Sequence, residues 1–128
     1  MKTNLKKLIG TAVLGLTLFT HSLPTWAGYV QQQFIEVRIE TNQASGSMVG
    51  ARYSGDSQQY ITCTSHNPAV TCSARDKTGR YLLCTKIDPQ WVAAVRTITD
   101  SSHISFALAP GTQTCDSLTI KNGSRFLK

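Results

Sequence analysis

The motifs of several common enzyme and cofactor sites are missing from this 128-residue chain. It has no Gly-x-Ser-x-Gly turn for a hydrolase nucleophile, no His-Glu-x-x-His zinc motif and no Asp-x-Asp-x-Asp-Gly calcium loop. It also lacks a glycine-rich phosphate loop and a Cys-x-x-Cys pair. The sequence therefore predicts no catalytic residues, no metal site and no cofactor.

No apolar run is long enough to cross a bilayer, which takes about 20 residues. The longest run, residues 8–19, follows a basic start that contains three lysines and no acid. Pro24 and the small residue Ala27 come shortly after it. This order is typical of a bacterial export signal. We predict a signal peptide over residues 1–27 and a single mature domain over 28–128, without a membrane span, that is secreted or periplasmic.

Acidic residues are scarce, with 7 Asp and Glu against 13 Lys and Arg. Three lysines leave with the signal peptide and all acids stay, so the mature charge is 10 − 7 = +3 instead of +6. The remaining basic residues are scattered, whereas a nucleic-acid binder clusters them. Their one local concentration, at residues 75–80, is typical of a charged turn. We therefore expect no nucleic-acid partner.

The four cysteines all lie in the mature part, and their spacings of 9, 12 and 31 residues match no zinc-finger pattern. An even number of cysteines in a short exported chain predicts disulfides, for which three connectivities exist. We favour Cys63–Cys72, which closes a short loop around a turn at Pro68. The second predicted pair, Cys84–Cys115, ties the middle of the chain to the last strand.

Short β-rich segments separated by turn residues predict an antiparallel sheet or small sandwich of about six to seven strands. Polar and apolar residues alternate over 33–41 and 103–108, as in strands with one buried face. The other predicted strands are 48–53, 59–64, 70–74, 81–86 and 114–121, and residues 42–47 are predicted to form a turn.

One segment has helical spacing instead. Asp88 suits a helix N-cap and Pro89 the first helical position. Apolar residues then recur at positions 91, 92, 95 and 98. This pattern predicts a short helix over 89–98 and makes the fold a β-rich α+β fold. Trp91 and Phe106 both lie on apolar stripes, which favours a place in the core.

The residues left for chemistry or binding are few. His66 lies in a predicted loop and His103 at the start of a strand, and both positions also suit a purely structural role. Tyr53 and Tyr60 flank the predicted turn at 54–59. An exposed aromatic cluster there would bind sugar or peptide, and packing at a sheet edge is the alternative.

The C-terminal half carries a distinctive order of residues. It runs Cys84-Thr85-x-x-Asp88-Pro89, Val92-x-x-Val95, Ile98, Ser102-x-Ile104-x-Phe106, Cys115-x-x-Leu118 and Asn122-Gly123-Ser124. In this half the chain resembles small exported bacterial four-cysteine proteins of unassigned function. The resemblance implies no catalytic residues.

Taken together, these features favour a small exported binding or interaction protein. Its partner would be a protein, which includes a hydrolase to be inhibited, or a surface glycan. The alternative is a small secreted hydrolase or toxin that uses His66 or His103. The sequence leaves the oligomeric state open.

Overall fold

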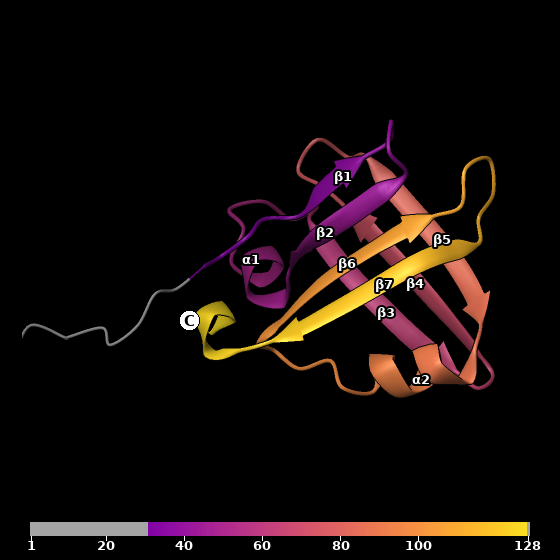
Figure 1. The fold of residues 1–128 in the computed structure, drawn as a ribbon. Helices are drawn as coiled ribbons and strands as arrows, with labels where there is room; N and C mark the ends of the chain where they lie inside the picture. The colour runs from indigo at the N-terminus through magenta and orange to yellow at the C-terminus, as the bar shows by residue number, and fades with distance from the viewer. Residues whose placement is uncertain (1–30, 128) are drawn as a thin grey trace, which may run out of the picture.

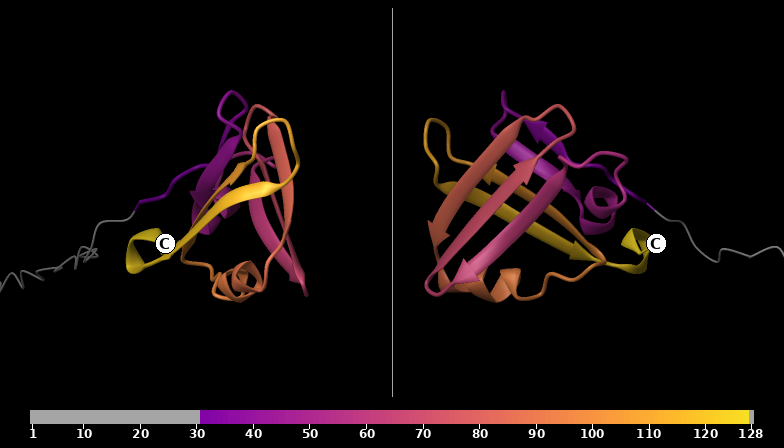
Figure 2. Two further views of the ribbon diagram at one scale, coloured as in Figure 1. Left: turned by 45° about the vertical axis from the view of Figure 1, so that its right-hand side comes forward. Right: turned by 180° about the vertical axis from the view of Figure 1, so that it is seen from behind.

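The computed structural model describes residues 31–127, so the predicted signal peptide and its cleavage site lie outside the described residues. In the described part, seven antiparallel strands form two sheets that face each other, and their strands cross (Figures 1 and 2). The elements are β1 (Glu36–Arg38), β2 (Gln43–Ser47), α1 (Met48–Arg52), β3 (Tyr60–His66), β4 (Ala69–Arg75), β5 (Tyr81–Ile87), α2 (Pro89–Val95), β6 (Ser102–Leu108), β7 (Cys115–Asn122) and the 3₁₀ turn η1 (Ser124–Phe126). The predicted β-rich sandwich is confirmed.

The four-stranded sheet has the order β1-β2-β6-β7, and the three-stranded sheet has the order β3-β4-β5. Alternate residues of each central strand point into the space between the sheets, because successive side chains of a strand face opposite sides. Val70 of β4 and Ile104 and Phe106 of β6 are completely buried there. This apolar layer is the core, and α2 closes one end of it (Figure 1).

Both predicted disulfides are confirmed. Cys63 and Cys72 lie directly opposite each other on β3 and β4, with 4.1 Å between their Cα atoms. Cys84 of β5 is bonded to Cys115 of β7, with 5.0 Å between the Cα atoms. The first bridge links two neighbouring strands of one sheet, and the second joins the two sheets.

The predicted helix is present but ends earlier, at Val95 instead of residue 98. Asp88 caps it by accepting a hydrogen bond of 2.8 Å from the backbone N–H of Gln90. After Val95, the N–H groups of Thr97 and Ile98 bond to carbonyls three residues back. These tighter bonds end the α-helical spacing and turn the chain toward β6.

The predicted turn at 42–47 and strand at 48–53 are wrong. Residues 43–47 form β2, a central strand, and residues 48–52 form α1. The reason is close packing: a Cβ atom on Gly46 would lie 2.4 Å from Cδ1 of Ile35, so only a small residue fits there. Ser47 then ends β2 and caps α1, because its hydroxyl accepts a 2.9 Å hydrogen bond from the N–H of Gly50.

The predicted strand at 33–41 is shortened to β1, Glu36–Arg38. Ile35 and Val37 are buried as the alternation predicts, but the side chain of Ile39 is 45% exposed. The chain turns directly after β1, and Asn42 in this turn has a positive φ of 51°. Asparagine is one of the residues that adopt this conformation readily, so β1 and β2 form a tight hairpin.

Candidate functional site

The side of the three-stranded sheet that faces away from the core is a regular surface that the sequence did not identify. Its side chains form four rows across β3, β4 and β5, namely Tyr60–Arg75–Tyr81, Thr62–Ser73–Leu83, Thr64–Thr71–Thr85 and His66–Ala69–Ile87. We call this surface the outer face, and the right-hand panel of Figure 2 looks onto its three strands. No helix covers it in that view.

The first row is a cluster of two aromatic rings and a cation. The guanidinium carbon of Arg75 lies 5.7 Å from the centre of the Tyr81 ring, within the range of a cation–π contact. The side chains of Tyr60 and Tyr81 are 37% and 41% exposed. Burial and the neighbouring Tyr60 raise the pKa of the Tyr81 phenol, against smaller lowering effects of Arg75 and Ser73. The Tyr81 phenol is therefore a neutral hydrogen-bonding group at neutral pH.

The charge of Arg75 is not compensated. The four rows of the outer face contain no Asp or Glu. Within residues 31–127, the ion pairs are Arg38–Glu36 and Arg80–Asp76, and neither involves Arg75. At the other end of the face, the side chain of Ile87 is 75% exposed. The outer face thus combines an unpaired cation and exposed tyrosines with an exposed aliphatic group.

Asp76 fixes the hairpin that brings Arg75 and Tyr81 opposite each other. Its buried carboxylate accepts hydrogen bonds from Thr78 N (2.9 Å), Thr78 Oγ1 (2.7 Å), Arg80 N (3.1 Å) and Arg80 Nε (2.7 Å). Burial by itself raises the pKa of Asp76, but these hydrogen bonds outweigh it and hold the pKa below its ordinary value. Asp76 is therefore a structural residue that positions the cluster.

The structure places the two histidines on different sheets. His66 ends the last row of the outer face. His103 lies on β6, where its ring stacks on Phe126 with 5.5 Å between the ring centres. Its buried Nδ1 has no hydrogen-bond partner, and burial, followed by the charge of Lys121, lowers the pKa of this imidazole. In the part of the chain that the structure describes, no hydrogen bond joins either histidine to a serine or a carboxylate.

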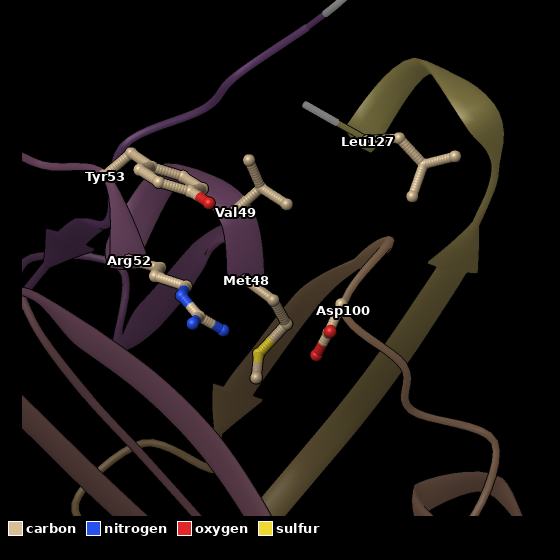
Figure 3. A pocket seen from close by; sticks show the side chains of 6 residues that line it. All are labelled: Met48, Val49, Arg52, Tyr53, Asp100 and Leu127. Atoms are coloured by element: carbon tan, nitrogen blue, oxygen red, sulfur yellow. The ribbon is translucent and has the colours of Figure 1, made fainter.

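An open hollow of about 260 Å³ lies beside α1 (Figure 3). Its lining residues are Met48, Val49, Arg52, Tyr53, Asp100 and Leu127. Arg52 and Asp100 point toward the same space but form no ion pair within 4 Å. The hollow is smaller than the roughly 300–1,000 Å³ of most small-molecule sites. Tyr53, which the sequence groups with Tyr60, lines this hollow, whereas Tyr60 belongs to the cluster on the outer face.

Sequence reasoning assigned Arg75 to a charged turn and missed the cluster. Arg75 and Tyr81 flank the hairpin turn at residues 76–80, so the hairpin alone was a signal that could have placed them opposite each other. Tyr60 joins them only through the register of β3 on β4. That register depends on tertiary pairing.

Among residues 31–127, no three His, Cys, Asp or Glu side chains are grouped so that they could hold a metal ion. None of the helices in this part of the chain has the length and apolar character that crossing a membrane requires. Comparison with protein-family models, with curated proteins and with solved structures found no match. The resemblance to small exported four-cysteine proteins stays a prediction.

Proposed function

We propose that this protein is an exported binding module that attaches through its outer face to a protein or a surface glycan outside the cytoplasm. The observation that carries the proposal is the row Tyr60–Arg75–Tyr81, in which an unpaired guanidinium lies beside exposed phenol rings on a sheet without acidic residues.

The residue types of this row suit recognition. Tyrosine and arginine supply a large share of the binding free energy at protein interfaces. A tyrosine ring offers a broad contact area and a hydroxyl while losing little conformational entropy when it is held. An unpaired arginine can accept a carboxylate in two parallel hydrogen bonds. The rows Thr62–Ser73–Leu83 and Thr64–Thr71–Thr85 of the same face add hydroxyl groups for the hydrogen bonds of a peptide or a sugar.

The scaffold supports the same function. The strands that carry the row are joined by Cys63–Cys72 and tied to the opposite sheet by Cys84–Cys115. A rigid surface loses less entropy on binding than a flexible one. Disulfides persist in oxidising compartments, which agrees with an export signal and a secreted or periplasmic location.

The experiment is a binding assay with the labelled mature domain on isolated cell envelopes and on concentrated culture fluid. We expect saturable binding for the wild type and a loss of at least tenfold in affinity for Arg75→Ser/Tyr81→Ser. The matched control is Tyr53→Ser, which removes a tyrosine of similar exposure, 48%, from the other surface. Binding that does not saturate contradicts the function. Saturable binding that Tyr53→Ser abolishes and the double variant keeps contradicts the site.

A further inference from the structure

The hollow beside α1 is formed by three segments that are far apart in the sequence. The turn before β6 supplies Asp100, and the C-terminal end of the described chain supplies Leu127. The other four lining residues come from α1 and the position after it, namely Met48, Val49, Arg52 and Tyr53. None of the lining residues belongs to the four rows of the outer face. The hollow is therefore a second surface, separate from the face that we propose for the partner.

Packing holds all three segments in place. α1 lies so close to the chain before β1 that a Cβ atom on Gly50 would be 2.0 Å from a backbone carbonyl oxygen of that chain. The turn that carries Asp100 is closed by the completely buried Ser102, whose hydroxyl accepts a 2.8 Å hydrogen bond from Thr99 N. The last segment, η1, is anchored by the buried ring of Phe126. A hollow with fixed walls loses little conformational entropy when a ligand enters it.

The hollow has an apolar floor and a charged rim. Val49 is buried and Met48 is half-buried, whereas Arg52 and Asp100 are exposed. In the view of Figure 3, the side chain of Met48 lies between the two charged groups. A ligand that reaches from one charge to the other therefore also covers apolar surface, and the burial of apolar surface is favourable.

The two charged groups of the rim have no partner within residues 31–127. The ion pairs of this part of the chain lie elsewhere, and no hydrogen bond involves the side chain of Arg52 or Asp100. The two groups point toward the same space without contact (Figure 3). A simple anion bound to Arg52 would be repelled by Asp100, and a simple cation bound to Asp100 would be repelled by Arg52. A small molecule that carries both signs is attracted by both groups.

We infer that the hollow binds a free α-amino acid with an apolar side chain. The carboxylate of the ligand accepts two parallel hydrogen bonds from the guanidinium of Arg52. Its ammonium group donates to the carboxylate of Asp100, and its side chain lies on the apolar floor. The volume of about 260 Å³ is below that of most small-molecule sites, which suits a ligand of this size.

This site goes beyond the binding function proposed for the outer face and does not depend on it, because the two surfaces share no residue. The hollow is open and the ligand is small, so we expect a dissociation constant on the order of 0.1 mM for leucine. Glycine lacks the aliphatic group that covers the floor, and it should bind about tenfold more weakly or worse.

The test is a titration of the ¹⁵N-labelled mature domain with L-leucine at neutral pH, followed by NMR. We expect saturable shifts of the backbone amides of Arg52, Asp100 and Leu127. Leucinamide, which lacks the carboxylate, and N-acetyl-leucine, which lacks the ammonium group, should each bind about tenfold more weakly, because each loses one charge-assisted contact.

Two variants connect each end of the ligand to one residue. Arg52→Gln and Asp100→Asn should each weaken leucine binding by about tenfold. Leucinamide should bind Arg52→Gln at least as well as it binds the wild type, since it has no carboxylate to lose. N-acetyl-leucine should likewise bind Asp100→Asn at least as well as it binds the wild type. Retained binding of these derivatives shows at the same time that both variants are folded.

The control variants are Arg96→Gln and Asp116→Asn, which remove the same charges from exposed positions after α2 and on β7. Both should bind leucine like the wild type. No saturable shift with leucine overturns the inference. Shifts that saturate but are absent from the lining residues, or control variants that weaken binding as much as Arg52→Gln, overturn the location. Equal affinity for leucine, leucinamide and N-acetyl-leucine overturns recognition of a zwitterion.

Discussion

Removal of either disulfide should destabilise the domain, and removal of Cys84–Cys115 should cost more. In the chain-entropy description, a cross-link stabilises by restricting the unfolded chain, and the effect grows with the number of residues in the loop. Cys84–Cys115 spans 31 residues and Cys63–Cys72 spans 9. These lengths give about 3.7 kcal/mol for the longer loop and about 2.6 kcal/mol for the shorter one at 25 °C.

The native structure adds to this difference. Cys84 and Cys115 are both buried and hold the two sheets together, whereas Cys63 and Cys72 lie on strands that a full hydrogen-bonded ladder already joins. The gap between the two double alanine variants should therefore be at least about 1 kcal/mol. Urea unfolding, followed by the fluorescence of Trp91, measures it. An equal loss for both variants, or a larger loss for Cys63→Ala/Cys72→Ala, would refute the reasoning.

Two further predictions concern titrating groups. Asp76→Asn should lower the free energy of unfolding by about 2–4 kcal/mol at pH 7, because it removes the charge that two donors of Thr78 and two donors of Arg80 satisfy. The folded-state pKa of Asp76 is below the unfolded value of about 3.9, so the wild-type advantage should persist above that pH and fade as the pH falls through the folded pKa. Asp116→Asn, at an exposed position of β7, is the control, and urea midpoints that fall equally in both variants would contradict the assignment. His103→Phe keeps a ring stacked on Phe126 and should flatten the stability profile between pH 7 and 5. The pKa of His103 is lowered, so its contribution is complete above the unfolded value of about 6.5 and is lost as the pH falls toward the folded pKa. Identical slopes in wild type and variant would sink this prediction.

Local patterns predicted the parts of the fold that local chemistry decides. The alternation of Ile104, Phe106 and Leu108 predicted the inward face of β6, and all three are buried. Asp88 and Pro89 predicted the start of α2. The type and spacing of these residues indicate which side chains are buried and where the helix begins. No information from distant segments was needed.

β2 and α1 could not be predicted in this way, because their small residues are required by contacts with residues that are far away in the sequence. Gly46 makes room for Ile35, and a Cβ atom on Gly50 would lie 2.0 Å from the carbonyl oxygen of Gln33. In the sequence the same glycines look like turn and strand-weakening residues. Glycine is needed at both positions because residues 33–35 pass very close to β2 and α1.

The cysteines and the candidate site show the same limit. Cys72 lies opposite Cys63 on one side and opposite Cys84 on the other, so strand neighbourhood alone also permits a Cys72–Cys84 bridge. The position of Cys115 on the facing sheet decides the pairing. Likewise, the row of Tyr60, Arg75 and Tyr81 exists only in the register of three strands, which no local pattern sets.

The most direct test of the binding face is chemical footprinting of the exposed tyrosines on the domain bound to its envelope or culture-fluid partner. Tyr53, Tyr60 and Tyr81 are all between 37% and 48% exposed, so each should react in the free protein. At a fixed protein concentration, saturating partner should protect Tyr60 and Tyr81 and leave Tyr53 reactive. Protection of Tyr53 with unchanged reactivity of Tyr60 and Tyr81 would contradict the assignment of binding to the outer face.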